Sequence, residues 1–391
     1  MDYAQEHGLT AAEEAWRKKA AAFAAKEIAP LARDWDRAGK FPREIVTRLG
    51  AAGLLGAALP KEAGGGGAGT LTGCLVAEEI GAVDGSVRGF LAVQAGLVAT
   101  PLHEFGAPAL KKQWLKDLLS GKAIGCCALT EPGAGSDLGA IATRVRTDGD
   151  HVVLDGEKVW ITSGGIADVA LVFGTVDPSK KTKGLECWVV PTRTPGFSAR
   201  PMPGKDLGHR ASDHAHVVLK GVRVPKGNRL GEACGGFAMA KHALEAGRLN
   251  VAAGAVGIHR ACLDASVEFA RTRRQFGSRV GDFQQVGATL ADMAVELKAA
   301  RLLTHHAARL RDRGLPSSEA VSAAKLYATE AALRAATHAI QIHGSRAYSD
   351  ELPIERHWRD VIALTIYEGT SQIQRLILSR GLLGKDDGDA T

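Results

Sequence analysis

The stretch from residue 238 to residue 274, AMAKHALEAGRLNVAAGAVGIHRACLDASVEFARTRR, says more about the architecture of this chain than any other. Its apolar residues recur at the three- and four-residue spacing of a helix that buries one face. The same periodicity returns over residues 283–313 and 317–342. Because only short turns separate these long helices, the sequence predicts a four-helix bundle at the C-terminal end of the chain.

The middle of the chain, from about residue 123 to residue 230, consists of short runs that alternate between apolar and polar residues. Asp155-Gly156 separates two such runs, which predicts a hairpin. Residues 10–119 show helical periodicity. The sequence therefore predicts a mostly α fold with a small β domain of barrel or sandwich type. The expected units are an N-terminal helical domain (1–122), a middle β domain (123–232) and a C-terminal helical bundle with a short polar tail (233–391).

The composition limits the possible classes of function but does not identify one. A chain of 391 residues exceeds the size of one hydrophobic core, so two or three domains are expected. The net charge of +6 and the pI near 9.0 suit an anionic ligand. The basic residues are nevertheless scattered and paired with acids along helices, so we do not expect nucleic-acid binding.

Cysteine usage and the first residues indicate the compartment. The six cysteines form neither a Cys-x-x-Cys pair nor a Cys/His metal spacing, so we expect reduced thiols and no metal site. The first seven residues lack the basic and apolar regions of a signal peptide. No stretch is long and apolar enough to span a bilayer, so the sequence predicts a cytoplasmic protein without membrane insertion.

A candidate catalytic base lies near the end of the chain, in IYEGTSQIQR, residues 366–375. Tyr367 can shield the Glu368 carboxyl from water, which raises its pKa toward the operating pH. Gly369 lets a substrate approach the backbone closely, and the Thr-Ser pair that follows can cap the next helix. The alternative is that Glu368 is a first-turn acid that only complements a helix dipole.

Three further motifs accompany this one: ALTEPGAGSD at residues 128–137, KVWITSGG at 158–165 and RRQFG at 273–277. Each alone is modest evidence, because a Gly-rich loop is usually a turn and Trp160 in an alternating strand is usually a packing residue. The four motifs in this order and spacing resemble the flavin-dependent acyl-CoA dehydrogenase family. The resemblance extends from the first amphipathic helix to Leu383 and implies the same order of helices, β domain and bundle.

The reaction that this resemblance implies removes two hydrogens from the α and β carbons of an acyl thioester. The α-proton needs a base and the β-hydride needs an acceptor, and because no side chain accepts hydride, FAD is the expected cofactor. The resemblance makes the Glu368 carboxylate the base. It also assigns polarisation of the thioester carbonyl to the Glu368 N–H together with a ribityl hydroxyl of the flavin.

The resemblance places further residues beside the thioester. Some family members carry the base just before the arginine that corresponds to Arg248, but Gly247 occupies that place here, so the alternative base is absent. Glu245 and Arg248 match positions that line the thioester and pantetheine passage, although a Glu and an Arg three apart on a helix also form simple ion pairs. The other expected substrate contacts are Tyr367, Gly369 and Ser136.

Two sets of residues are expected at the flavin. The set at the ring side is Thr130, Ser136, Trp160 and Thr162, and further expected cofactor contacts are Cys127, Leu129, Thr370 and Gln372. The other set, the nucleotide set, matches residues that reach the adenosine diphosphate half of a flavin in a neighbouring subunit, where arginine pairs with pyrophosphate and phenylalanine faces adenine. It comprises Arg273, Phe276 and Gln284, and we join to it Gln341, Gly344 and Ser345, which are expected to lie close to the dinucleotide. Such sharing predicts a homo-oligomer, commonly a tetramer in this family, although Ser345 and Ala347 stand where the family usually has glycines.

Arg88 is the clue to the substrate, because it is a charge inside an otherwise apolar helical stretch and needs a partner. The stretch resembles glutaryl-CoA dehydrogenases, whose arginine at this position meets the distal carboxylate of the substrate. It also resembles the dehydrogenases that make hydroxymalonyl carrier-protein extender units. The alternative is an ion pair with Glu78, Glu79 or Asp84. A short or carboxylated acyl group is thus favoured over a long fatty chain.

Several functions stay open at this point. The first is an acyl-CoA dehydrogenase that passes electrons to an electron-transfer flavoprotein. The second is the same chemistry on an acyl-carrier-protein thioester in natural-product biosynthesis. A non-catalytic flavin- or DNA-binding relative is a third, against which the intact Glu368 motif argues, and an oxidase that reduces oxygen is a fourth.

Overall fold

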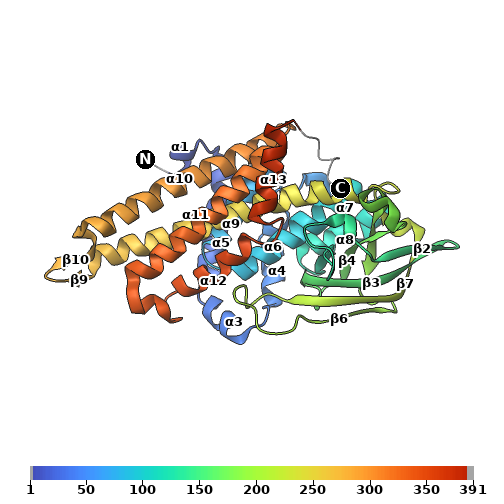
Figure 1. Cartoon of the computed structure of the whole chain (residues 1–391), viewed down its shortest axis with the longest axis horizontal. Coiled ribbons are helices and arrows are strands. Elements are labelled where there is room, and N and C mark those ends of the chain that lie inside the picture. Colours follow the sequence, from blue (N-terminus) through green and yellow to red (C-terminus); the bar gives the residue numbers. More distant parts are fainter. Residues whose placement is uncertain (1–2, 385–391) are drawn as a thin grey trace.

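A computed structural model describes residues 3–384 of the chain. The molecule is elongated, with long helices at one end, a β-sheet at the other and the N-terminal helices between them (Figure 1). The expected fold class, mostly α with a small β domain, is confirmed. No helix within residues 3–384 is both long enough and apolar enough to cross a membrane.

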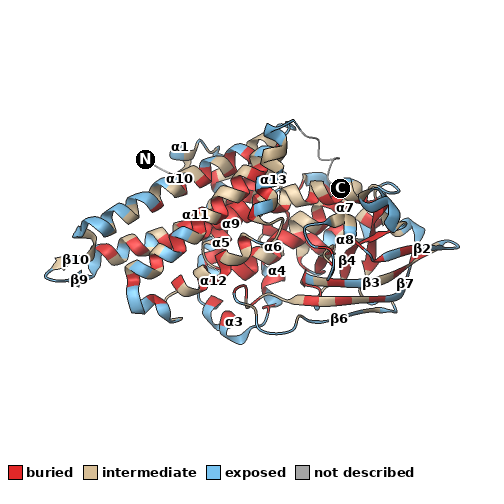
Figure 2. Ribbon diagram, in the orientation of Figure 1, coloured by how far each residue is buried: buried red, intermediate tan, exposed pale blue. Residues whose placement is uncertain are grey.

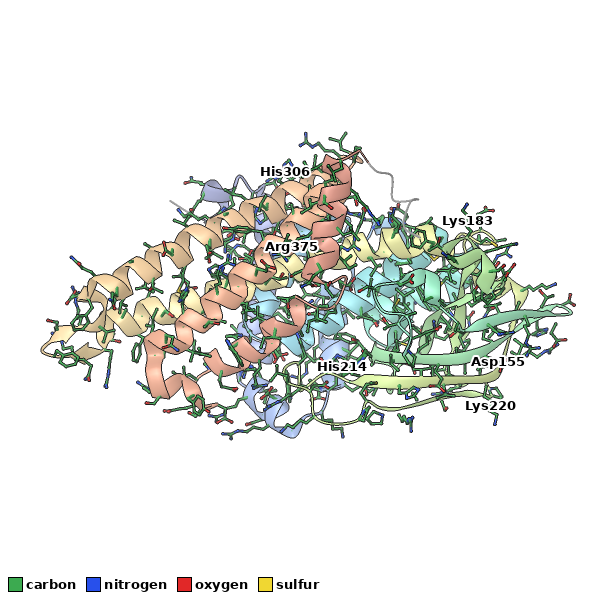
Figure 3. All side chains as sticks on the ribbon, in the orientation of Figure 1. Asp155, Lys183, His214, Lys220, His306 and Arg375 are labelled. Atoms are coloured by element: carbon green, nitrogen blue, oxygen red, sulfur yellow. The ribbon has the colours of Figure 1, made fainter. Side chains whose placement is uncertain are left out.

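The bundle consists of α9 (Gly236–Thr272), α10 (Gln284–Asp312), α11 (Ser318–His343) and α13 (Ser371–Leu382). The first three pack against one another, and α13 packs against α11, where Arg375 pairs with Glu330 at 2.8 Å (Figure 3). Small side chains allow the long helices to approach closely. On α11 the fully buried residues that face its neighbours include Ala324, Ala328, Ala332, Ala335, Ala336 and Ala339.

The N-terminal region is a cluster of short helices. They are α1 (Tyr3–His7), α2 (Ala11–Phe23), α3 (Ala32–Ala38), α4 (Glu44–Ala51), α5 (Gly69–Gly81), α6 (Gly85–Leu91), α7 (Thr100–Phe105) and α8 (Pro108–Ser120), with the π-helical segment η4 (Ala92–Ala99) joining α6 to α7. The apolar helix α5 packs against both α9 and α10. This contact fixes α6, which carries Arg88, beside the bundle.

The β domain is one eight-stranded sheet. Its strands are β1 (Gly125–Ala128), β2 (Arg144–Asp148), β3 (His151–Thr162), β4 (Val169–Thr175), β5 (Leu185–Pro191), β6 (Phe197–Pro201), β7 (His214–Pro225) and β8 (Arg229–Leu230). The order is β6-β7-β3-β2-β4-β5-β8, and β1 pairs with β4 in parallel. Buried residues are concentrated within the sheet and where the bundle meets α5 and α6 (Figure 2).

The hairpin expected at Asp155-Gly156 is wrong, because both runs belong to the single strand β3. A register shift between Leu154 and Gly156 shows that the pair forms a bulge. Asp155 accepts hydrogen bonds from the backbone N–H of Gly221 and from Arg146 (Figure 3). Any side chain at residue 156 would collide with Thr143, so glycine here serves close packing rather than a turn.

Candidate functional site

The turn that carries the candidate base Glu368, residues 365–370 and named the catalytic turn for that expected role, connects α12 (Ile354–Leu364) to α13. Glu368 has φ 57° and Gly369 has φ 89°, so two successive residues are left-handed. Thr370 then caps α13, because its Oγ1 accepts a hydrogen bond from the Ile373 N–H at 3.3 Å. The expected cap is therefore present, and Glu368 lies before the helix rather than in its first turn.

Glu368 is half-buried, and one oxygen of its carboxyl is shielded from water. Its Oε2 is buried and has no hydrogen-bond partner among the described residues. Gly247 on α9 lies directly against it, because a Cβ on Gly247 would come within 2.5 Å of Oε2. Burial raises the pKa of Glu368 from 4.5 to about 7, while the charges of Arg248, Lys325 and Arg88 oppose the shift. Such a carboxylate can act as a base near neutral pH.

The backbone of the turn is held by side chains that sequence reasoning missed. Lys325, fully buried on α11, donates a hydrogen bond from Nζ to the Gly369 carbonyl at 2.8 Å. Gln374 donates from Nε2 to the carbonyls of Glu368 at 3.3 Å and Gly369 at 3.0 Å. The available signal was Lys325 itself, a charge within the apolar stretch Ala323–Ala328, the same kind of signal that identified Arg88.

The Glu368 N–H points to a second role for this turn. It has no acceptor within residues 3–384, whereas the Glu368 carbonyl accepts from Arg248 Nε at 3.0 Å. The N–H is therefore available to a ligand oxygen. Glu245, the other expected residue of this helix face, forms an ion pair with Arg311 at 2.9 Å. Arg248 thus touches the turn itself, while Glu245 is bound to the end of α10.

Arg88 is a buried cation next to the catalytic turn. It is 1% exposed, and one of its Nη atoms donates to the Tyr367 hydroxyl while the other donates to Asn250 Oδ1 at 3.4 Å. The alternative of an ion pair with a nearby acid is wrong, since no carboxylate in the described part of the chain lies within 4.0 Å of Arg88.

The three acids proposed as its partners are engaged elsewhere. Glu78 pairs with Arg260 and Arg301, and Glu79 pairs with Arg17 and Arg260. Asp84 caps α6 through the Val87 N–H.

His209 lies on the other side of Tyr367. Its Nε2 is 3.5 Å from the Tyr367 hydroxyl, and burial lowers the pKa of His209 to about 3, so the ring stays neutral. The backbone N–H of His209 donates a hydrogen bond to Asp360 Oδ1 at 2.6 Å. Burial raises the pKa of Asp360 to about 7. Neutral His209 adds no charge to the site, and Arg88 remains the cation nearest to Tyr367.

Several of the residues expected at the flavin ring lie on the last part of β3 and in the segment after β1. A register shift between Lys158 and Ile161 marks a bulge in β3, which gives Trp160 a φ of 58° and leaves it 55% exposed. The same bulge lets the Val159 N–H donate to the Thr130 carbonyl at 2.9 Å, so the first two motifs are joined. An exposed indole on a rigid strand offers a flat face to a ring system.

The other ring-side residues lie around this bulge and the catalytic turn. Cys127 is half-buried on β1, where burial raises the pKa of its thiol to about 12. Leu129, Thr130 and Thr162 are half-buried, whereas Ser136 and Gln372 are exposed. Glu131 anchors the loop before Ser136 by its ion pair with Lys158 at 2.8 Å. The residues present therefore fit a flavin ring held between the sheet and Glu368.

The nucleotide set lies elsewhere, at the far tip of the bundle (Figure 1). Arg273 and Phe276 follow the end of α9, and α9 advances about 37 Å between Arg248 and Arg273. The Phe269 and His343 rings are 4.5 Å apart, so the ends of α9 and α11 meet there. That contact brings three further residues, all exposed, to the same tip: Gln341, Gly344 and Ser345.

Within one chain, therefore, the nucleotide set and the ring set do not meet. Phe276 is 96% exposed, and Gln284 at the start of α10 is exposed as well. Gly344 keeps the left-handed φ of 60° that its position requires, although Ser345 and Ala347 replace glycines typical of the family.

Comparison with known proteins agrees with this geometry. Models of the acyl-CoA dehydrogenase N-terminal, middle and C-terminal domains match residues 10–122, 126–222 and 235–383. The chain is 41% identical over 376 residues to a probable acyl-CoA dehydrogenase of Bacillus subtilis, covering 96% of this chain and 99% of the relative. It is also 41% identical over 361 residues to the human mitochondrial short-chain specific acyl-CoA dehydrogenase, covering 92% and 87%.

Solved structures give the same result. Butyryl-CoA dehydrogenase from Megasphaera elsdenii superposes with a TM-score of 0.94 at 35% identity, covering 98% of this chain and 100% of the other. A glutaryl-coenzyme A dehydrogenase in complex with glutaryl-CoA gives 0.94 at 34% identity, covering 100% and 99%. The prolyl acyl carrier protein oxidase AnaB gives 0.91 at 32% identity, covering 95% and 99%. The chain therefore belongs to the acyl-CoA dehydrogenase family of FAD-dependent oxidoreductases.

Proposed function

We propose that this protein dehydrogenates a short acyl-CoA at the α and β carbons, with Glu368 as the base, and that it favours acyl groups with a carboxylate at the far end. The observation that carries the proposal is the Glu368 carboxyl, which has one buried oxygen without a hydrogen-bond partner among the described residues and a pKa raised to about 7. A structural carboxylate would be expected to have its oxygens satisfied.

Different groups of the catalytic turn and its surroundings have different roles in the reaction. The Glu368 carboxylate removes the α-proton, and FAD supplies the acceptor for the β-hydride. The Glu368 N–H is free to donate to the thioester carbonyl oxygen, where negative charge develops. Arg248, Lys325 and Gln374 keep this N–H and the carboxylate in one fixed geometry, because all three bind the backbone carbonyls of the turn.

Arg88 supports the choice of substrate. A buried guanidinium without a carboxylate is costly, and a substrate carboxylate next to the Tyr367 hydroxyl would supply the missing charge. Its guanidinium also contacts the hydroxyl of Tyr367, the residue directly before Glu368, so Arg88 and the base flank the same turn.

A second candidate is the same reaction on an acyl-carrier-protein thioester, which the likeness to a prolyl acyl carrier protein oxidase favours. For either substrate we propose a homo-oligomer, most simply a tetramer, in the cytoplasm, with an electron-transfer flavoprotein as electron acceptor. The intact base argues against a family member that only binds flavin or DNA.

The test is anaerobic bleaching of the flavin in the purified protein. Butyryl-CoA, octanoyl-CoA, glutaryl-CoA and a carrier-protein thioester would be titrated separately into wild type and into Glu368→Gln. We expect bleaching of wild type by butyryl-CoA and glutaryl-CoA. We expect none in Glu368→Gln, which keeps its flavin but has no base. Rapid bleaching of Glu368→Gln would refute the assignment, and bleaching only by the carrier-protein thioester would establish the second candidate.

Arg88 has its own prediction. Arg88→Gln should lower kcat/KM for glutaryl-CoA by about 100-fold or more, since one partner of a buried ion pair is lost. Pentanoyl-CoA, which matches glutaryl-CoA in length without the charge, should be affected no more than about threefold. Steady-state assays with an artificial electron acceptor measure both. Equal losses of kcat/KM for the two substrates would show that Arg88 has a structural role and does not bind the substrate carboxylate.

A further inference from the structure

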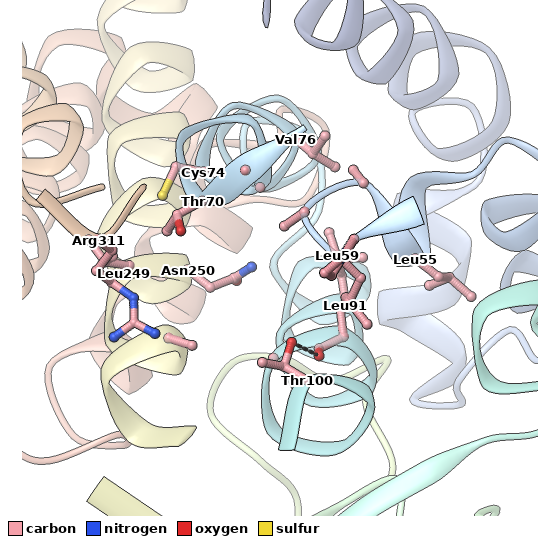
Figure 4. A pocket seen from close by; sticks show the side chains of 18 of the residues that line it. Leu55, Leu59, Thr70, Cys74, Val76, Leu91, Thr100, Leu249, Asn250 and Arg311 are labelled. Carbon is pink, nitrogen blue, oxygen red and sulfur yellow. Dashed lines mark hydrogen bonds between the residues drawn. The ribbon is translucent and has the colours of Figure 1, made fainter. Parts of the chain in front are cut away.

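A cavity of about 370 Å³ lies beside the acyl site, between α5, η4 and α9 (Figure 4). Much of its wall is apolar, from Leu55 and Leu59 to Leu91 and Leu249. This volume is in the range of pockets that hold small organic ligands. Neither Glu368 nor Arg88 is part of its lining, but Asn250, which contacts Arg88, is.

Asn250 lies between Arg88 and the cavity. Its Oδ1 accepts the hydrogen bond from Arg88, and its side chain also lines the cavity. Figure 4 shows it pointing away from α9 into the cavity, with the amide nitrogen at its end. That nitrogen has no acceptor among residues 3–384. On the opposite side of Asn250, Arg88 reaches Tyr367 and the catalytic turn.

The position of Asn250 along α9 corresponds to the far end of a short acyl group. Gly247, which faces the Glu368 carboxyl, precedes Asn250 by three residues, a rise of about 4.5 Å along the same helix face. The α carbon of the substrate must lie near Glu368. A chain that runs along this face therefore arrives at Asn250 and Arg88 after a few carbon atoms.

We propose that Asn250 determines the acyl specificity of the enzyme, by closing the acyl site against the cavity and by fixing Arg88 for a distal carboxylate. This inference rests on the proposed function. An alkyl chain long enough to enter the cavity would have to push the carboxamide aside and leave it and Arg88 without their hydrogen bond, which is costly for buried polar groups. An acyl group that ends at Arg88 leaves the bond intact.

Two variants separate the closing of the acyl site from the positioning of Arg88. Asn250→Ala opens the acyl site into the cavity, so kcat/KM should rise about tenfold or more for octanoyl-CoA and fall about tenfold for glutaryl-CoA. Asn250→Leu keeps the bulk but loses the hydrogen bond, so it should impair glutaryl-CoA by a similar factor without a gain for octanoyl-CoA. Cys74→Ala is the matched control, because Cys74 lines the same cavity from α5 without contacting Arg88. It should leave the ranking of the substrates unchanged.

Calorimetric binding of 2-octenoyl-CoA, a product that needs no turnover, gives an independent reading. Asn250→Ala should bind it about tenfold more tightly than wild type. An unchanged affinity for 2-octenoyl-CoA, or equal losses for all substrates in both Asn250 variants, would overturn the proposal. A wild-type flavin that no thioester bleaches would instead refute the proposed function, and the binding comparison would still decide whether Asn250 closes the cavity.

Discussion

Glu368 sits in a backbone conformation that non-glycine residues rarely adopt. Its φ of 57° is followed by the φ of 89° at Gly369, and residues held in this way cost about 1–3 kcal/mol each unless the surroundings fix them. Here Lys325 and Gln374 fix the turn through its carbonyls. The result is a carboxyl held against Gly247 without a hydrogen bond to Oε2, a state suited to proton removal rather than to stability.

The buried carboxyl gives a prediction for stability against pH. The pKa of Glu368 rises from 4.5 to about 7 on folding, so the folded state favours the neutral form. Its stabilising contribution is complete below pH 4.5 and is lost as the pH rises to 7. Glu368→Gln is always neutral. The free energy of unfolding of Glu368→Gln should therefore exceed that of wild type by an amount that grows as the pH rises through this range, to about 3 kcal/mol at pH 8.

Thermal unfolding midpoints of both proteins at pH 5, 6, 7 and 8 measure this effect. The midpoint of Glu368→Gln should exceed that of wild type at pH 8, and the difference should shrink toward pH 5. A difference that does not change with pH would mean that the carboxyl is not dehydrated in the folded protein.

At this scale the sequence revealed residues with unusual neighbours and missed those that act through the backbone. Glu368 and Arg88 could be picked out because a charge beside apolar residues needs a reason. The contact of Asn250 with Arg88 joins positions 162 residues apart, and Gln374 binds the carbonyls of a turn whose conformation had to be known first. No local pattern encodes such contacts.

Among the elements, α9 contributes most to the site. Glycines on one of its faces leave room for side chains from other elements. Gly247 and Gly254 lie on the same face of this helix, two turns apart. A Cβ on Gly247 would meet the Glu368 carboxyl, and a Cβ on Gly254 would come within 2.7 Å of Arg88 Cδ. One helix face thus leaves room for both the base and the candidate carboxylate-binding group.

These two glycines give a matched pair of variants. Alanine is about 1 kcal/mol more favourable than glycine within a helix, and in both cases the nearest colliding side chain is flexible, so both proteins should fold. Gly247→Ala displaces the base and should lower kcat/KM for every substrate by about 100-fold. Gly254→Ala displaces Arg88 and should impair glutaryl-CoA far more than pentanoyl-CoA. Circular dichroism and flavin content check the fold, and identical substrate profiles for the two variants would contradict this division.

The elements themselves were predictable where periodicity extends over many residues. The three long bundle helices α9, α10 and α11 begin and end within two residues of the predicted positions, because small buried residues recur over whole helices. The error at Asp155-Gly156 has a clear reason. An Asp-Gly pair suits both a turn and a bulge, and the packing of Thr143 against Gly156, which distinguishes them, comes from a neighbouring segment.

At the scale of the whole molecule, the two halves of the expected flavin site lie far apart along α9, which advances about 37 Å between Arg248 and Arg273. The ring set and Glu368 lie where the sheet meets the bundle, and the nucleotide set lies at the exposed tip (Figure 1). Phe276 is 96% exposed at this tip, and its ring lies 6.2 Å from that of the partly exposed Phe283. In the proposed homo-oligomer, a second copy of the chain would bring the tip of one subunit to the ring set of another.

Mixed oligomers distinguish sharing between subunits from two independent sites. Arg273→Ala keeps its base but provides a defective tip, whereas Glu368→Gln has no base but provides an intact tip. If each tip serves a neighbouring subunit, co-expression of the two inactive variants places an intact tip beside an intact base in some sites. Flavin bleaching by butyryl-CoA should then return to about a quarter of the wild-type amplitude, since half of the subunits keep Glu368 and about half of those meet an intact tip.

Each variant alone, purified in the same way, is the control. If the tip instead acted within its own chain, every subunit of the mixture would carry one defect and bleaching would stay absent, because no exchange of partners could then join Glu368 to Arg273.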